Sequence, residues 1–141
     1  MPQLTAYLSF DGTCRDAMRF YERVLGGKLE ALLTHAEAPD GPPVPASHAD
    51  RLMHAYLAHP EFGLMAGDVP PGVPFTPMQG VMLALTYPSA DEARRVFAAL
   101  AEGGNVTMPL AETFWAEAFG MVTDRWGTPW GVNGGMKPPA R

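Results

Sequence analysis

The chain has a single cysteine among its 141 residues, so no disulfide can form within it and nothing demands an oxidising compartment. It has no run of lysine or arginine, and its net charge of −5 disfavours nucleic acid as a partner. No apolar stretch reaches the length of a membrane span, and the first residues lack the basic and apolar regions of a secretory leader. These absences predict a cytoplasmic protein that binds neither nucleic acid nor a membrane.

A glycine-rich nucleotide-binding loop is also missing. The pairs Gly26-Gly27 and Gly103-Gly104 follow expected helices instead of opening them, which is typical of helix ends and not of phosphate sites. Without a glycine-rich loop between a strand and a helix, the chain has no recognisable place for a methyl donor. A methyltransferase activity is therefore disfavoured.

What the chain does contain is the composition of one folded domain. Its hydrophobic fraction of 47% and charged fraction of 18% are those of a globular protein with a real core. Its 15 prolines crowd into two stretches, residues 38–45 and 69–77, which must therefore be loops.

A strand-helix unit occurs twice, at residues 4–27 and 81–104. Shifting one copy by 77 positions aligns Leu8 with Leu85 and also aligns the glycine pairs that end the two helices. A fixed offset that keeps strand, helix and stop signals together indicates a duplicated module. We expect a single domain over residues 1–141, with module 1 at about 1–68, a proline-rich linker at 69–79 and module 2 at 80–141.

Alternation along the strands predicts which face each side chain takes. Over residues 4–10 the apolar set begins at Leu4 and includes Leu8, and it should lie under a helix. Over residues 51–59 the set of Met53, Ala55 and Leu57 is expected to face the helix, which turns His54 and its neighbour Tyr56 to the opposite side.

The remaining elements are expected from turn and cap signals. Asp11 or Thr13 can cap the first helix and Ser89 the second, and Pro109 is expected to end a short strand. Residues 111–120 are ambiguous between a helical turn and a loop. The other expected strands cover residues 28–35, 62–66, 80–87, 105–108, 121–123 and 130–133.

Many ordered residues resemble one family. They are Tyr7-Leu8, Phe10, Gly12, Cys14, Ala17-Met18, Phe20-Tyr21, Gly26-Gly27, His54-Ala55, Gly103-Gly104, Met108-Pro109-Leu110, Phe114-Trp115, Phe119-Gly120, Asp124, Gly127 and Trp130. This pattern resembles the PhnB-like branch of the vicinal-oxygen-chelate superfamily, which includes glyoxalase I, extradiol dioxygenases and bleomycin-resistance proteins. Ala116 departs from the family pattern, which usually has glycine there.

The resemblance implies an α+β fold of two βαβββ modules, each a half-open sheet with its helix outside and a concave face inside. In this superfamily two modules combine to make each cavity. The two modules come from one chain or from two chains of a domain-swapped homodimer, and a homodimer is the expected assembly.

The resemblance also implies four metal-ligand positions, on the first and last strands of each module. The first-strand positions map by the repeat offset onto Thr5 and Met82, and the last-strand positions fall near Met65 or Ala66 and near Gly131. None offers a carboxylate or imidazole ligand. We therefore expect neither a metal nor another cofactor, with a divalent metal as the alternative.

His54 is the candidate catalytic residue, because an imidazole on a cavity face can bind an anion or act as a general base. A half-buried histidine that is simply hydrogen-bonded to a neighbour explains it equally well. The expected ligand-binding residues are Thr5, Tyr7, Ser9, His54, Tyr56, Met82, Phe114 and Trp115.

Three other residues have simpler structural interpretations. Asp68 could be a cavity carboxylate but is more often a turn former, and Asp124 is expected to cap a tight turn. Cys14 stands at a helix N-terminus, where a thiol pKa can fall, yet a structural role is favoured because no histidine is nearby in sequence.

Two functions of different classes follow from these observations. The first is a metal-independent small-molecule-binding protein, with antibiotic sequestration of the bleomycin-resistance kind as one form of it. The second is a metal-dependent lyase or oxidoreductase of the glyoxalase or dioxygenase kind, in which an ion polarises the substrate. A purely structural dimerisation module is disfavoured by the polar lining expected for the first strand.

Overall fold

The structure is a computed structural model that describes residues 1–39 and 43–139. It divides into two compact units, Met1–Pro77 and Met78–Arg141. Residues 69–77, the proline-rich stretch, contain no helix or strand. Part of the first expected proline loop (residues 40–42) and the end of the chain (residues 140–141) lie outside the described residues.

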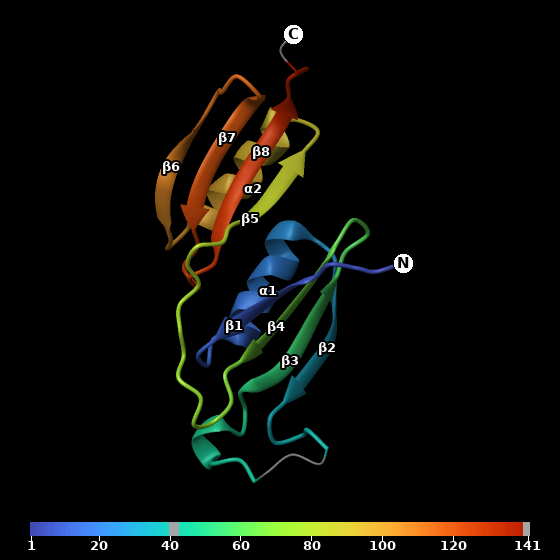
Figure 1. Cartoon of the computed structure of the whole chain (residues 1–141), viewed down its shortest axis with the longest axis vertical. Coiled ribbons are helices and arrows are strands. Elements are labelled where there is room, and N and C mark those ends of the chain that lie inside the picture. Colours follow the sequence, from blue (N-terminus) through green and yellow to red (C-terminus); the bar gives the residue numbers. More distant parts are fainter. Residues whose placement is uncertain (40–42, 140–141) are drawn as a thin grey trace. The chain divides into compact units, whose positions relative to one another are not determined.

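The first unit is a four-stranded mixed sheet with one helix on one face (Figure 1). The strands stand in the order β1-β4-β3-β2, with β1 parallel to β4 and the other neighbours antiparallel. A short 3-10 helix, η1 (Ala46–His48), precedes β3. The elements are β1 (Ala6–Phe10), α1 (Cys14–Leu25), β2 (Lys28–Thr34), β3 (Leu52–Ala58) and β4 (Gly63–Asp68).

The second unit repeats this topology, with strand order β5-β8-β7-β6 and β5 parallel to β8. Its first strand begins at Leu83, 77 positions after Ala6 at the start of β1. The elements are β5 (Leu83–Tyr87), α2 (Ala90–Ala101), β6 (Asn105–Ala111), β7 (Ala116–Thr123) and β8 (Pro129–Met136). The expected α+β fold of two βαβββ modules is confirmed.

The core of each unit lies between its helix and one face of its sheet. In the first unit Leu8, Ala55 and Leu57 are buried under α1, beside the buried Phe20 and Tyr21 of the helix. Burying each large apolar side chain contributes about 1.5–3 kcal/mol. In the second unit the helix side is formed by the buried residues Ala93, Val96, Phe97, Leu100, Ala118, Val122, Trp130 and Val132.

The two helices begin in different ways. Ser89 caps α2 as expected, because its Oγ accepts a hydrogen bond from the N–H of Glu92 at 3.2 Å and donates to the Glu92 carboxylate at 3.1 Å. Thr13 stands at the start of α1 but makes no side-chain cap hydrogen bond. The expectation that Thr13 or Asp11 caps α1 is therefore wrong, and Asp68 of β4 takes this role, as described below.

Two side-chain orientations differ from the expected alternation. Leu52 is fully buried whereas Met53 is 37% exposed, the reverse of the prediction. The pairing of β2 with β3 jumps from Leu33–His54 to Thr34–Leu52, so Met53 has no partner in β2 and forms a bulge. Leu4 is also fully exposed, because β1 begins only at Ala6.

The second sheet extends further than expected. β6 continues through Pro109 to Ala111, which the sheet tolerates because β6 is an edge strand whose register also shifts in this stretch. The ambiguous residues 111–120 divide into the end of β6, a short loop and the start of β7.

Candidate functional site

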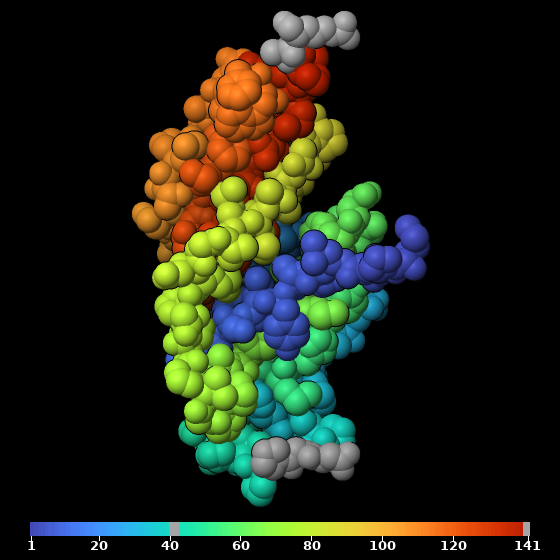
Figure 2. Space-filling view, viewed as in Figure 1, coloured from blue at the N-terminus to red at the C-terminus, as the bar shows by residue number. Residues whose placement is uncertain are grey.

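The face of the first sheet opposite α1 has no helix over it and carries the polar side chains of β1 and β3. Tyr7 and Ser9 are exposed there and alternate with the buried residues Leu8 and Phe10 of the helix side. We call this surface the first open face. In the space-filling view the dark-blue segment that includes β1 lies at the surface, uncovered by a helix (Figure 2).

Tyr7 and His54 meet on the first open face. The Tyr7 hydroxyl donates a hydrogen bond to the main-chain oxygen of Met53 at 3.1 Å and lies 3.5 Å from Nδ1 of His54. Their rings are stacked, with centroids 5.8 Å apart and an interplanar angle of 28°. The contact joins residues 47 positions apart and crosses β4, which lies between β1 and β3 in the sheet.

Two backbone features make room for this pair. The bulge at Met53 leaves its carbonyl outside the ladder with β2, where it can accept from Tyr7. Gly67 of β4 lies directly beneath, and a Cβ at that position would approach the Met53 oxygen to 2.6 Å and the Tyr7 hydroxyl to 2.8 Å. A glycine is therefore required under the Tyr7 hydroxyl.

The electrostatics of Tyr7 keep its hydroxyl protonated. Partial burial, and to a smaller degree the nearby Cys14, raise the pKa of Tyr7 above its ordinary value of 10.0. At neutral pH Tyr7 is therefore a neutral hydrogen-bond donor. The other ring nitrogen of His54, Nε2, makes no hydrogen bond with a described residue.

The other expected residues of the first unit lie on or next to the same face. The ring of Tyr56 lies across Gly63, where a Cβ would be 3.0 Å from the Tyr56 hydroxyl. Ser9 is two residues beyond Tyr7 on β1, and Thr5 is half-buried immediately before the strand. The structure therefore brings Tyr7 and His54 into contact and leaves Thr5, Ser9 and Tyr56 around them.

The second sheet also has a face without a helix, which we call the second open face. Trp115 of the β6–β7 loop donates a hydrogen bond from Nε1 to Oδ1 of Asn133 at 3.0 Å. Its ring packs edge to face against Phe119 at 5.2 Å and against Phe114 at 4.9 Å. The Phe114 side chain is 84% exposed. These aromatic rings and one amide form a surface with both apolar area and hydrogen-bonding capacity.

The β6–β7 loop that carries Trp115 is held in place by hydrogen bonds to the side chain of Thr113. The Thr113 hydroxyl oxygen accepts from the N–H groups of Trp115 at 3.3 Å and Ala116 at 3.1 Å.

Asn133 was not among the expected site residues, and neither was the Met53 carbonyl. The signal for Asn133 was present, since a lone amide alternating with the apolar Val132 on a strand indicates a polar position on the open side.

The four positions that the family uses for metal ligands do not make a metal site. Met65 pairs with Tyr7 on the first open face, so Met65 and not Ala66 occupies the third position. The side chain of Met82 lies against Gly131, where a Cβ would be 2.7 Å from its terminal methyl carbon. Within residues 1–39 and 43–139, no three His, Cys, Asp or Glu side chains gather as a metal site would require. These residues do not fit a divalent ion.

Asp68 is the last residue of β4 and not a turn former, so that interpretation is wrong; its carboxylate reaches the edge of a polar cavity described below, but it is bound to main-chain N–H groups. It is 5% exposed and lies on the helix side of β4. One carboxylate oxygen accepts from the N–H groups of Gly12 at 2.8 Å and Cys14 at 3.1 Å, and the other accepts from the N–H of Leu52 at 2.9 Å. Asp68 thus caps α1 and ties β3 to it.

Asp124 has the corresponding structural role in the second unit. Its Oδ1 accepts from the N–H groups of Trp126 at 2.9 Å and Thr128 at 3.0 Å, as expected of a residue that caps a tight turn. Its Oδ2 accepts from Nε1 of the buried Trp130 at 2.8 Å. Both buried aspartates are therefore committed to the fold and are left out of the candidate site.

Cys14 is fully buried. Burial, reinforced by the negative charge of Asp68 and opposed by Arg15, raises the pKa of the Cys14 thiol from its ordinary 9.0 to about 12. We expect no labelling of Cys14 by a thiol reagent in the folded protein near neutral pH, and rapid labelling once the protein is unfolded in urea, because only an accessible thiolate reacts.

The same pKa shift has a consequence for stability. Below pH 9 the thiol is protonated in both states, whereas between pH 9 and 12 only the unfolded chain releases the proton. Stability should therefore fall as pH rises through this window, by about 1.4 kcal/mol per pH unit from this group. A Cys14→Ser variant should lose this dependence. An equal slope in wild type and variant would show that Cys14 does not cause it.

Comparisons with known proteins identify the fold. Residues 3–132 match the sequence model of the Glyoxalase/Bleomycin resistance protein/Dioxygenase superfamily. The chain is 34% identical over 139 residues to protein YjdN of Escherichia coli strain K12, covering 92% of this chain and 93% of YjdN. The crystal structure of protein PA1353 from Pseudomonas aeruginosa has 47% identity and a TM-score of 0.88, covering 94% of this chain and 97% of PA1353.

A PhnB protein from Bacillus cereus, provisionally described as a 3-demethylubiquinone-9 3-methyltransferase, has the same fold. Its TM-score is 0.73 at 24% identity, covering 94% of this chain and 98% of the PhnB protein. Among the described residues, no helix has the length and apolar character needed to cross a membrane. The sequence match, the YjdN relative and the two repeated modules agree: this chain belongs to the Glyoxalase/Bleomycin resistance protein/Dioxygenase superfamily.

Proposed function

We propose that this protein binds a small aromatic or apolar molecule on its open sheet faces without a metal ion. The observation that carries the proposal is the Tyr7–His54 pair, in which a neutral phenol and an imidazole stack on a sheet face that no helix covers. Tyr7 itself is 50% exposed, and the neighbouring Met53 is 37% exposed. A face of this kind supplies contact area together with a few directed polar groups.

The chemistry of the pair favours a ligand that carries an acidic group. Nδ1 of His54 faces the Tyr7 hydroxyl, so Nε2 is the nitrogen available to a bound molecule. A protonated imidazole donates to a carboxylate or phenolate, and a neutral imidazole accepts from a weakly acidic hydroxyl. The ring of Tyr7 can stack on the flat part of the same molecule.

Trp115 extends the proposal to the second unit. Its Nε1–H is held by Asn133, which fixes the indole ring and presents its face. Together with Phe114 and Met82, both substantially exposed, it offers an apolar platform.

The protein should work as a homodimer, since superfamily members commonly combine two modules around each cavity. Light scattering on the purified protein tests the assembly.

The binding proposal is tested by a thermal-shift screen of aromatic acids, hydroxamates and antibiotics, followed by calorimetry on each compound that stabilises the protein. We expect binding in the presence of a chelator. His54→Ala should weaken it about tenfold or more, the effect of losing one hydrogen bond to a charged group. Tyr7→Ala should also weaken it, because the ring that stacks on the ligand is lost. His48→Gln, a change in η1 away from the open face, should leave the affinity unchanged.

Two results would refute the proposal. If affinity survived the combined loss of the Tyr7, His54 and Trp115 side chains, the site would lie elsewhere. If binding or turnover required an added divalent ion, the metal-dependent glyoxalase type of chemistry would replace it. A hit among the antibiotics alone would identify sequestration as the form that the binding takes.

A further inference from the structure

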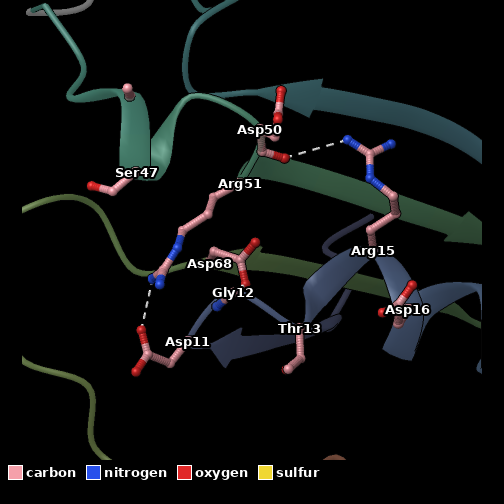
Figure 3. A pocket seen from close by; sticks show the side chains of 10 residues that line it. Asp11, Gly12, Thr13, Arg15, Asp16, Ser47, Asp50, Arg51 and Asp68 are labelled. Carbon is pink, nitrogen blue, oxygen red and sulfur yellow. Dashed lines mark hydrogen bonds and ion pairs between the residues drawn. The ribbon is translucent and has the colours of Figure 1, made fainter.

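A polar cavity of about 490 Å³ lies in the first unit, outside the first open face (Figure 3). Four parts of the chain form it: the loop between β1 and α1, the first turn of α1, the segment from η1 to the start of β3, and the end of β4. The charged residues that matter are Asp11, Arg15, Asp16, Asp50, Arg51 and Asp68. Its volume is sufficient for a molecule of the size of an amino acid.

Three of these six charged side chains already have ion-pair or hydrogen-bond partners within the protein. Arg51 forms an ion pair with Asp11 at 2.7 Å, and its guanidinium lies over Gly12, where a Cβ would be 3.3 Å from the guanidinium carbon. Asp68 at the back of the cavity holds three N–H groups with its two oxygens. None of these three side chains needs a ligand.

The other three charged side chains, those of Arg15, Asp16 and Asp50, form no ion pair with a described residue. The guanidinium of Arg15 makes one long hydrogen bond, 3.4 Å to the main-chain oxygen of Asp50, and forms no ion pair with a described residue, although its charge adds to the hydrogen bonds with Thr34 in lowering the pKa of Glu37. The Asp50 and Asp16 carboxylates have no hydrogen-bond or ion-pair partner among the described residues. Figure 3 shows Arg51 and Arg15 on opposite sides of the cavity, with Asp50 between them along one rim. One cation and two anions thus remain available.

From this charge arrangement we infer that the cavity binds a small zwitterion with an extra amine, such as a basic amino acid. The ligand carboxylate pairs with the five-donor fork of Arg15, and its amines pair with Asp50 and Asp16. A simple anion is disfavoured because four aspartates outnumber two arginines around the cavity. A diamine without a carboxylate leaves Arg15 unpaired.

The probe is L-lysine, titrated into ¹⁵N-labelled protein while the backbone amide signals of Gly12, Arg15 and Asp50 are followed by NMR. Because each exposed ion pair adds at most about a fivefold factor in affinity, we expect a dissociation constant in the millimolar range. L-lysine should bind about fivefold more tightly than cadaverine, which lacks the carboxylate, or 6-aminohexanoate, which lacks the second amine.

Variants assign the contacts. Arg15→Gln should reduce L-lysine binding to the level of cadaverine, and Asp50→Asn should reduce it to the level of 6-aminohexanoate. Arg95→Gln, an exposed arginine of the second unit, should change nothing. Signal changes that do not saturate, or that sodium chloride reproduces at matched ionic strength, would overturn the inference. Since Arg15 lies outside the open faces, aromatic-ligand binding should be the same in Arg15→Gln and wild type, which separates this outcome from the proposed function.

Discussion

Replacing Asp68 with alanine should lower the free energy of unfolding by about 4 kcal/mol, since three N–H groups lose their acceptor and each unsatisfied buried group costs about 1–3 kcal/mol. The three are the N–H groups of Gly12, Cys14 and Leu52. Thr13 supplies no side-chain cap to replace the carboxylate at the start of α1. The contact also joins segments 54 and 16 residues from Asp68, so its loss affects the whole first unit.

Urea unfolding followed by circular dichroism measures this effect. Asp68→Asn keeps one side-chain oxygen and should lose about half as much stability, roughly 2 kcal/mol. Asp50→Ala is the matched control, an exposed aspartate of the same unit whose loss should change stability by less than about 0.5 kcal/mol. If Asp68→Ala were no more destabilising than Asp50→Ala, Asp68 would not be the cap of α1.

Replacing Gly134 with alanine should destabilise the second unit by about 3 kcal/mol, the upper part of the range for an overpacked core. A Cβ on Gly134 would lie 2.5 Å from both the Ala93 side chain and the Ser89 main-chain oxygen, and 3.0 Å from the Cα of Ala90. The obstacle is the backbone of α2 itself, which cannot yield without moving the helix off the sheet.

Gly131, three residues earlier on β8, is the matched control for this prediction. A Cβ there would meet only the flexible end of the Met82 side chain, which can rotate away. Gly131→Ala should therefore cost less than about 1 kcal/mol, although its Cβ approaches an atom at 2.7 Å. Equal losses of stability at the two positions would contradict the close packing of α2 on β8.

A comparison of Asp68 with Gly134 also explains how one repeat gives two different helix starts. Asp68 and Gly134 occupy corresponding places, because each pairs with the last residue of the first strand of its unit, Phe10 or Tyr87. In the first unit a carboxylate reaches from the sheet to the helix. In the second unit the helix approaches the sheet and Ser89 supplies the cap locally.

The repeat, the fold class and most strand faces could be predicted from the sequence because they depend on local periodicity. Alternation correctly placed Leu8 with the core, and it placed Ala55 and Leu57 under α1. Alternation failed at Leu52 and Met53 because a bulge inserts one residue, and sequence periodicity carries no signal for a register shift. Pro109 was misread because its edge position was unknown.

For the candidate site, the sequence predicts which sheet face a residue occupies but not which residues touch. Tyr7 and His54 were expected on one face, and the structure adds that they touch and that the Met53 carbonyl anchors the hydroxyl. The cavity around Arg15 and Asp50 was not predicted, because it is assembled from four parts of the chain that have no common pattern in the sequence. The role of Asp68 depends equally on distant partners.

The most direct test of metal-independent binding is the metal content of untagged protein, measured by mass spectrometry after purification without chelators. The corners of the family's metal site are occupied by Thr5, Met65, Met82 and Gly131, which supply no imidazole or carboxylate. We expect far less than one divalent ion per chain. One ion per chain, lost when His54 is replaced, would contradict the central claim.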